Sequence, residues 1–441
     1  MKDVILCKFG GSSLSDANQF KKVKNIIEKD ERRKFIVVSA PGKRSYIPGD
    51  KKVTDLLYLV SDLAHHNENF DEQLNRVYYR FKEIVDDLNL QIDLDEEFRL
   101  IKSDILNNGS EAEIISRGEY LSGKILAEFL GYEFVDPKEL IVISRSLGTT
   151  RWSETREKIS NRLKNVERAV IPGFYGINIK GDISTFSRGG SDVTGAVIAR
   201  GLNAILYENW TDVDGFRMAD PRVIPEAKKI DVISYNELRE LSYMGASVLH
   251  EEAMIPCMRG GITIEIKNTN FPDLKGTKIT DINKSENIDT VLSGISGKKG
   301  FVAINVEKML LNLERGILAD LISIFDRYNV SIEHIPTGID SITVVCEYKD
   351  VEKYLERIIR DIQLQLNPDN VSIYKDISLL AVVGRNIFSE PGILAKIFKA
   401  LEERDINVRL ISQGISQISV VFGVESKDLE ESIKAIYRAF E

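Results

Sequence analysis

The clearest chemical potential lies in the turn KFGGSS, residues 8–13, which directly follows a short apolar run. An apolar run without alternation predicts a strand that is buried on both faces. Gly10 and Gly11 allow a sharp turn that brings the backbone close to a ligand. Lys8 adds a positive charge and Ser12 a hydroxyl. The pattern indicates either an anion-binding turn or an ordinary strand-to-helix turn with a surface lysine. It is not a P-loop, in which the lysine follows the glycines.

A second glycine-rich turn, TFSRGGSD at residues 185–192, precedes an apolar helical pattern at residues 193–199. Arg188 offers a planar fork of donors that suits a carboxylate or a phosphate. Asp192 stands at the predicted start of the helix. An internal ion pair between Arg188 and Asp192 is the alternative. An arginine, two glycines and an acid together exceed what a bare turn requires, so a binding site is favoured.

Three further polar residues stand at places where an α/β fold meets ligands. Ser39 follows the apolar residues 35–38 at the carboxyl end of a predicted strand, although such a hydroxyl often closes its own turn. Thr54 is predicted to cap a helix or face a ligand. Glu119 is predicted to lie mid-helix beside Gly118, which costs roughly 1 kcal/mol relative to alanine and suggests that something comes close. A solvated glutamate is the alternative.

Acidic residues gather in the segment ENWTDVDGF, residues 208–216, after a predicted strand at residues 204–207. Acids at a strand end can hold a metal-bound nucleotide or accept hydrogen bonds from ribose hydroxyls. An Asp-Gly pair alone more often marks a turn. The nearby DPR triplet adds one more cation, Arg222.

Several short apolar runs alternate with helical patterns and would position these residues. This alternation predicts an α/β domain over residues 1–292, with a mostly parallel central sheet sandwiched by helices. A helical insertion without a chemical motif is predicted at about residues 62–112. The remaining strands are expected at residues 34–42, 140–143, 169–171 and 262–266.

The last third of the chain contains an internal repeat. The tetrapeptide GILA at residues 316–319 recurs at residues 392–395, an offset of 392 − 316 = 76 residues. Each copy predicts a ferredoxin-like βαββαβ unit, at residues 300–375 and 376–441, or a nested pair in which the strand at residues 300–307 joins the second unit. The glycine before each helix leaves room for a small carboxylate ligand. A dimerisation module without a ligand is equally compatible.

Composition limits the functional classes. The 441 residues carry 29% charged and 43% hydrophobic side chains, the profile of a soluble globular protein of several domains. The net charge of −9 and the lack of a basic block argue against nucleic-acid binding. No apolar run approaches the length of a membrane span. Three cysteines among apolar neighbours predict reduced thiols in a cytoplasmic protein, and four histidines without ligand spacing argue against zinc.

Taken together and in order, six short motifs resemble those of the aspartokinases, members of the amino-acid kinase fold that carry two C-terminal ACT domains. The motifs are KFGGSS (8–13), VSA (38–40), SRGE (116–119), IPGF (171–174), RGGSD (188–192) and WTDVDG (210–215). With the repeat, the resemblance spans essentially the whole chain.

The resemblance implies ATP-dependent phosphorylation of the β-carboxylate of L-aspartate to 4-phospho-L-aspartate, the first step towards lysine, threonine and methionine. A carboxylate is already a nucleophile at neutral pH, so no general base is required. The charge on the transferred phosphoryl group needs stabilisation by a lysine, backbone N–H groups and Mg²⁺. The metal is expected to be held mainly by the phosphates, without protein ligands.

The resemblance also assigns roles to residues of this chain. Lys8, Arg188 and Asp192 are implied as catalytic, with Lys8 bridging the attacking carboxylate and the phosphates. The implied aspartate-binding residues are Ser39, Thr54, Glu119, Phe174, Arg188 and Asp192, with Arg188 on the α-carboxylate and the two acids on the ammonium. The implied nucleotide-binding residues are Lys8, Gly10, Gly11, Ser12, Thr211, Asp212 and Arg222.

The chain departs from the family pattern in three places. Arg217 stands where relatives have an aromatic nucleotide neighbour, and Asn270 stands where some have a lysine. The pattern leaves open whether Arg217 or Lys267 contacts the nucleotide instead. In the first ACT unit, Glu314 and Glu333 replace the serine and aspartate of lysine-inhibited relatives.

Feedback regulation is expected through the ACT units. Lysine is the expected effector, with threonine or a joint response as alternatives, and the implied contacts are Ile317, Leu318 and Glu333. Pairing of ACT sheets predicts a homodimer, or a tetramer.

Two other functional classes compete with this interpretation. A different amino-acid kinase, such as glutamate 5-kinase or acetylglutamate kinase, would lack the SRGE helix and the paired ACT tail. An amino-acid sensor with an inactive kinase domain would be expected to have lost some of Lys8, Glu119, Arg188 and Asp192. A fused homoserine dehydrogenase is not expected, because no glycine-rich Rossmann fingerprint follows residue 376.

Overall fold

The computed structural model divides the chain into two compact units. Unit 1 contains Met1–Phe216, Ile230–Tyr235 and Ser247–Asn287, and unit 2 contains Arg217–Lys229, Asn236–Ala246 and Ile288–Glu441. The described residues are 3–144, 149–187, 189–245, 249, 251–281, 291–385, 387, 390–414 and 418–441.

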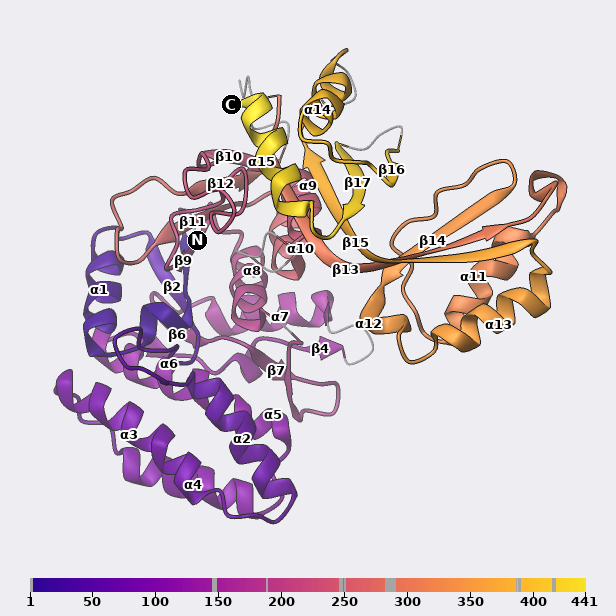
Figure 1. Cartoon of the computed structure of the whole chain (residues 1–441). Helices are drawn as coiled ribbons and strands as arrows, with labels where there is room; N and C mark the ends of the chain where they lie inside the picture. The colour runs from indigo at the N-terminus through magenta and orange to yellow at the C-terminus, as the bar shows by residue number, and fades with distance from the viewer. Residues whose placement is uncertain are drawn as a thin grey trace. The chain divides into compact units, whose positions relative to one another are not determined.

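Unit 1 is built on an eight-stranded sheet (Figure 1). In spatial order its strands are β10 (Val232–Ser234), β12 (Thr277–Thr280), β11 (Thr263–Asn268), β9 (Leu206–Thr211), β1 (Ile5–Phe9), β2 (Arg33–Val38), β6 (Ala169–Pro172) and β3 (Glu133–Phe134). Neighbouring strands are parallel except for the antiparallel pair β11 and β12. Every residue of the central strand β1 is buried, as its unbroken apolar run predicts.

Helices follow the strands of unit 1 and cover its core. They are α1 (Ala17–Glu28), α2 (Val53–His65), α3 (Asp71–Asp87), α4 (Leu94–Leu106), α5 (Glu111–Ile115), α6 (Arg117–Leu130), α7 (Trp152–Leu163), α8 (Gly190–Leu202) and α10 (Glu251–Gly260). Asp16 caps α1, accepting a hydrogen bond from the amide of Gln19. The predicted insertion is helical, and α2, α3, α4 and α5 lie together along one side of the unit (Figure 1).

Three local expectations are wrong. The segment 140–143 does not enter the central sheet, because only β4 (Ile143–Ser144) forms there and pairs with β5 (Thr149–Thr150). The strand expected at 204–207 is β9, which begins at Leu206 and continues to Thr211. Glu119 lies in the first turn of α6, not mid-helix. Short connections in unit 1 form η1 (Gly11–Leu14), η2 (Pro137–Glu139), β7 (Tyr175–Ile177) and β8 (Ile183–Thr185).

Unit 2 is built on a five-stranded antiparallel sheet in the order β14 (Ser341–Glu347), β13 (Gly294–Glu307), β15 (Asn370–Val383), β17 (Ser419–Glu425), β16 (Leu410–Ser412). Its helices are α11 (Ile317–Arg327), α12 (Tyr348–Val351), α13 (Leu355–Leu366), α14 (Ile393–Glu402) and α15 (Leu429–Phe440), with η4 (Leu311–Leu313). α9 (Tyr235–Tyr243) directly continues the chain from β10 and lies in unit 2 from Asn236 onwards.

The repeat is visible as two hydrophobic cores on the two halves of this sheet. One core joins β14, α11 and α13, and the other joins β17, α14 and α15 (Figure 1). Gly316 and Gly392 cap α11 and α14 with positive φ angles of 88° and 92°, so the repeated GILA tetrapeptide has one conformation in both copies.

The long strand β13 contributes to both cores. Its residues 294–298 pair with residues 379–383 of β15, and its residues 301–307 pair with β14 and with residues 370–377. Exact ACT boundaries stay a prediction. The three cysteines are free and buried, as expected. In the described parts of the chain, no helix is both long and apolar enough to cross a membrane.

Candidate active site

The buried Lys8 forms an ion pair with the partly buried Asp192 at the carboxyl end of β1. The Lys8 ammonium lies 2.5 Å from the Asp192 carboxylate, and only 7% of the lysine is exposed. Asp192 is in the first turn of α8, and Asn209 donates a hydrogen bond of 2.9 Å to the same carboxylate oxygen. The register of β1 and β9 places Lys8 beside Asn209. Two neighbouring strands and a helix start thus converge on one charged group.

The KFGGSS turn passes directly beside this lysine. The amide of Gly10 donates to the carbonyl of Trp210 at 2.9 Å, which ties the turn to β9. A Cβ atom on Gly10 would lie 3.5 Å from the Lys8 ammonium nitrogen, so the backbone of Gly10 is close to the lysine charge. The turn continues into η1, in which the amide of Ser13 donates to the carbonyl of Gly10. The amides of Gly11 and Ser12 come before this hydrogen bond in the chain. Such amides can bind an anion next to the lysine.

The segment after β2 lies directly against this turn. The amide of Gly42 donates to the carbonyl of Gly11 at 2.7 Å, and the amide of Ser39 donates to the carbonyl of Phe9 at 3.1 Å. A Cβ on Gly42 would lie only 2.6 Å from the carbonyl carbon of Gly11. Gly42 is therefore required by contact between two backbones.

Glu119 is a fully buried carboxylate, and its Oε2 atom has no hydrogen-bond partner among the described residues. Burial raises the pKa of its carboxyl to about 8, although the Ala40 amide and the Lys8 charge oppose the shift. Gly118 permits this placement, because a Cβ there would lie 2.7 Å from the Cβ of Ala40. A buried acid with an unused oxygen can receive a cationic group of a ligand.

Phe174 adopts a left-handed backbone conformation, with a φ of 77°. Its amide donates to the hydroxyl of Thr194 at 3.0 Å, and a Cβ on Gly190 would lie 2.5 Å from its ring. Strain at a bulky residue often marks a functional position. Gly190 is thus required where the start of α8 meets Phe174. Arg188, which was expected in this turn, lies outside the described residues.

The other expected residues are more dispersed. Thr54 lies in the first turn of α2 and is not its cap, a position held by Lys52. Thr211 ends β9, and its hydroxyl donates to the Asp212 carboxylate at 3.1 Å. Arg222 belongs to unit 2, where its guanidinium donates to both carboxylate oxygens of Asp220.

The three departures also have local partners. Arg217 belongs to unit 2 and donates to the carbonyl of Ala227 at 3.1 Å. Lys22 donates to the side-chain oxygen of Asn270 at 2.7 Å, so α1 brings a positive charge to that position. The ammonium of Lys267 lies 5.1 Å from the centre of the Trp210 ring.

Sequence reasoning missed the support behind this site. Glu208 was expected among strand-end acids, but it lies inside β9 and is 3% exposed. Its carboxylate accepts hydrogen bonds from Arg33 at 2.9 and 3.0 Å and from the Trp210 indole at 3.0 Å. Asn209 was missed as well. The signal that could have identified them is the pair of consecutive polar residues, Glu208 and Asn209, between Tyr207 and Trp210 in β9.

Comparison with known proteins gives a consistent result over the whole chain. A model of the amino acid kinase family matches residues 3–268, and a model of the ACT domain matches residues 380–440. Aspartokinase 3 of Bacillus subtilis (strain 168) is 35% identical over 98% of each chain. Lysine-sensitive aspartokinase 3 of Escherichia coli (strain K12) is 25% identical over 99% of each chain.

Among solved structures, the aspartate kinase of Clostridium acetobutylicum, described as an allosteric enzyme, is 47% identical. The similarity covers 100% of both chains, with a TM-score of 0.90.

Proposed function

The chain belongs to the aspartokinases of the amino acid kinase family, and we propose that it transfers the γ-phosphoryl group of ATP to the β-carboxylate of L-aspartate. The products are ADP and 4-phospho-L-aspartate, an intermediate of amino-acid biosynthesis. One observation carries the proposal: the Lys8–Asp192 ion pair occurs together with a buried acid, Glu119, that has an unused oxygen. This arrangement suits an acceptor that is both an anion and an ammonium ion.

The reaction needs charge stabilisation more than proton transfer. An oxygen of the aspartate β-carboxylate attacks the γ-phosphorus, and the bond from that phosphorus to the β,γ-bridging oxygen breaks, leaving its electron pair on ADP. Lys8 offers a desolvated positive charge to the attacking carboxylate and to the phosphates of ATP, which must approach one another although all are anionic. Mg²⁺, when bound with ATP, would neutralise further phosphate charge and is expected to be held mainly by the phosphates. Asp192, fixed by Asn209, orients the lysine.

Glu119 fits the role of receiving the substrate ammonium. Its raised pKa means that the free site holds a protonated carboxyl near neutral pH, and an incoming ammonium favours the ionised form. Binding would therefore release a proton. Arg188 is proposed for the α-carboxylate of aspartate on the strength of the resemblance, and Ser39, Thr54 and Phe174 for the wall of the same pocket.

The nucleotide is proposed to bind along the KFGGSS turn and the end of β9. The closeness of the Gly10 backbone to the Lys8 ammonium supports this placement for the phosphates, with Gly11 and Ser12 supplying amides. Thr211 and Asp212 are proposed for the ribose or the phosphates. Arg222 remains a proposed contact that would require release from Asp220.

Regulation through unit 2 is proposed on the likeness to an allosteric relative and to a lysine-sensitive one. Lysine is the favoured effector, and threonine or both together are the alternatives. The space at the start of α11 supports a ligand there, since no atom lies within 4 Å of a Cβ built on Gly316. Glu333 is proposed to bind the effector ammonium, and Ile317 and Leu318 to line the site. The hydroxyl of Tyr243 donates to Glu333.

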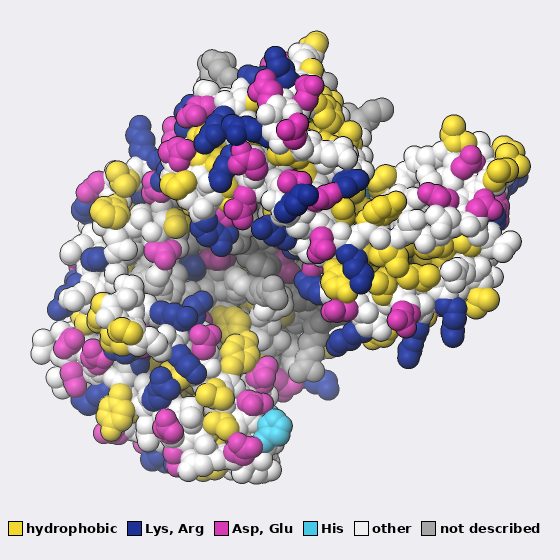
Figure 2. Space-filling view, viewed as in Figure 1, with side chains coloured by type: hydrophobic (Ala, Val, Ile, Leu, Met, Phe, Trp, Pro, Cys, Tyr) yellow, Lys and Arg dark blue, Asp and Glu magenta, His cyan; other side chains and the backbone are white. Residues whose placement is uncertain are grey.

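A homodimer, or a tetramer built from dimers, is proposed to form through the ACT units. The sheet of unit 2 ends on one side at β14, and along its outer edge His334 and Thr337 form isolated antiparallel bridges with Val345 and Ile342. Figure 2 shows hydrophobic side chains gathered on the lobe that carries β14 and α11. Met309, Leu313 and Ile339, each more than 70% exposed, belong to this region. Exposed apolar side chains gathered on one lobe favour pairing with a second copy.

The proposed reaction is tested by trapping the acyl phosphate with hydroxylamine, using L-aspartate and L-glutamate in parallel assays with ATP and Mg²⁺. We expect hydroxamate formation with aspartate only, and suppression when lysine is added. A preference for glutamate would refute the substrate. Failure to form hydroxamate with either acid would favour the inactive-kinase sensor.

A further inference from the structure

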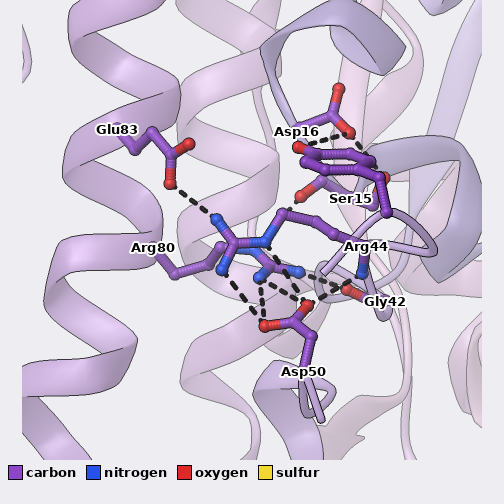
Figure 3. A network of polar contacts seen from close by, with 8 residues as sticks. Ser15, Asp16, Gly42, Arg44, Asp50, Arg80 and Glu83 are labelled. Atoms are coloured by element: carbon purple, nitrogen blue, oxygen red, sulfur yellow. Dashed lines mark hydrogen bonds and ion pairs between the residues drawn. The ribbon is translucent and has the colours of Figure 1, made fainter. Parts of the chain in front are cut away.

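A buried arginine on the helical insertion holds the two loops of the candidate active site together. Arg80, on α3, is 5% exposed and uses all three nitrogens of its guanidinium (Figure 3). Its Nε donates to the carbonyl of Ser15 at 3.1 Å, and its Nη2 donates to the carbonyl of Gly42 at 2.5 Å. Its Nη1 donates to both oxygens of Asp50, at 3.0 and 2.8 Å.

The two carbonyls belong to segments that the proposed reaction must keep in register. Ser15 ends the turn that begins at Gly10 and is proposed to hold the phosphates. Gly42 ends the segment that begins at Ser39 and is proposed to line the aspartate pocket. The two segments already touch where the amide of Gly42 donates to the carbonyl of Gly11. Arg80 adds a second tie between them, from outside the sheet.

The arginine itself is fixed by a charged network. The carboxylate of Asp50 also accepts from the amide of Arg44 at 2.8 Å and from its guanidinium at 3.1 Å. Burial of the Asp50 carboxyl would raise its pKa, but the hydrogen bonds from Arg44 and Arg80 outweigh burial and hold that pKa well below its usual range. Arg44 in turn bonds Glu83, on the same helix as Arg80, at 2.7 Å. The guanidinium therefore has one orientation (Figure 3).

We propose that Arg80 is a positioning residue that sets the separation between the phosphate turn and the acceptor loop. Reacting atoms must come within about 3 to 3.5 Å, and a misplacement of about 1 Å can cost roughly 100-fold in rate. A planar guanidinium can bond two carbonyls and a carboxylate in one plane, which a lysine ammonium cannot reproduce. The role belongs to the insertion, which otherwise lacks chemistry. The proposal rests on the proposed function for the meaning of the two loops.

The test compares Arg80→Lys with Arg76→Lys, a control that changes an exposed arginine one helical turn earlier on α3. Steady-state constants for aspartate and ATP are measured together with hydrogen exchange of residues 10–15 and 39–42. We expect Arg80→Lys to lower kcat by about 10- to 100-fold, with a much smaller change in either KM, and to speed exchange in both segments. Arg76→Lys should leave kcat and exchange unchanged.

Asp50→Asn provides a second variant, because it weakens the hydrogen bonds that fix Arg80 without changing either loop carbonyl. We expect it to lower kcat by less than Arg80→Lys and to serve as the test if that variant does not fold. Unchanged kcat and exchange in a folded variant would overturn the proposal, as would a lower melting temperature with an unchanged kcat. If the wild-type chain forms no acyl phosphate, the proposed function fails, and exchange alone then decides whether Arg80 ties the loops.

Discussion

At the scale of single residues, the site is built from buried charges that folding alone does not favour. Glu119 has an unused oxygen, and burial raises its carboxyl pKa from 4.5 to about 8. The folded chain therefore holds a proton there between these pH values that the unfolded chain has lost. The free energy of unfolding thus falls as the pH rises from about 4.5 to 8 and regains nothing above it. Folding stability thus favours the protonated carboxyl of Glu119, whereas the proposed substrate binding requires the ionised form.

Replacing Glu119 by glutamine should separate folding stability from substrate binding. Because binding needs the ionised carboxylate, the wild-type KM for aspartate should fall as the pH rises from 6.5 to 8.5. Glu119→Gln should abolish this slope and raise the KM by about 10- to 100-fold at pH 8.5. The same variant should melt higher than the wild type at pH 8.5, where the buried carboxylate is charged. Calorimetry and initial rates over this pH range provide the measurement, and an unchanged slope would contradict the assignment.

Lys8 gives a second prediction at this scale. Lys8→Met should lower kcat by about 10²- to 10³-fold, the cost of losing one desolvated group that stabilises the transition state. It should also destabilise the chain, because the largely buried Asp192 charge would lose its lysine partner and, among the described side chains, keep the hydrogen bond from Asn209. The double variant Lys8→Met/Asp192→Asn should recover melting temperature but not activity. Recovery of activity in the double variant would show that Lys8 acts only as a partner for Asp192.

At the scale of elements, glycines decide how closely helices and loops approach one another. Gly118 lets α6 pack against Ala40, and Gly42 lets the segment after β2 touch the KFGGSS turn. Both contacts are made where a Cβ atom would collide with a neighbour. Helix propensity alone would favour alanine at residue 118 by roughly 1 kcal/mol. The position of Glu119 therefore depends on a glycine that weakens its own helix.

This argument predicts the effect of filling that contact. Gly118→Ala should lower the melting temperature and raise the KM for aspartate, because the added methyl pushes α6 away from Ala40 and carries Glu119 with it. The compensating pair Gly118→Ala/Ala40→Gly removes the atom that lies 2.7 Å from the new Cβ and should restore much of the KM. Titration with aspartate and thermal melting test both variants. A Gly118→Ala chain that is more stable and equally active would refute the packing argument.

At the scale of the whole molecule, the backbone runs directly from the sheet of unit 1 into unit 2. α9 follows β10 of the unit 1 sheet without a break and belongs to unit 2 from Asn236 onwards. Within unit 2, Glu237 of α9 pairs with Arg385 at 3.2 Å, and Tyr243 donates to Glu333. An effector shifts the equilibrium between two states of the kinase only if its affinity for the two states differs. Such a difference would arise if the effector binds differently when Tyr243 is bonded to Glu333.

The repeat supplies a matched control for this proposal. At the offset of 76, Glu333 corresponds to 333 + 76 = 409, which is Arg409, a residue that pairs with Glu425. An arginine repels an ammonium ion, so the effector ammonium is expected only at the first copy. Glu333→Gln should raise the lysine concentration for half-inhibition by about tenfold or more, with an unchanged KM for aspartate. Arg409→Gln should leave it unchanged. Inhibition by threonine alone would replace lysine as the effector.

The sequence by itself determined the family, the fold class and the local elements around the motifs, and the comparisons confirm the first two. Short-range signals sufficed, because an unbroken apolar run defines β1. The roles of individual site residues stay predictions. The repeated GILA tetrapeptide likewise predicted the paired helix starts at Gly316 and Gly392, because their left-handed φ angles require a residue such as glycine.

Only the tertiary structure decided which distant residues meet. Lys8 and Asp192 are joined because β1, β9 and α8 converge, and Glu208 is buried against Arg33 although its sequence neighbours suggested a strand end. Arg80 belongs to no sequence motif, and its proposed role depends on hydrogen bonds to two carbonyls that lie 65 and 38 residues away. Local sequence encodes the propensity for helix, strand or turn, whereas such contacts depend on packing between segments that are far apart in the sequence. That is why the charged residues could be named from the sequence and the positioning arginine could not.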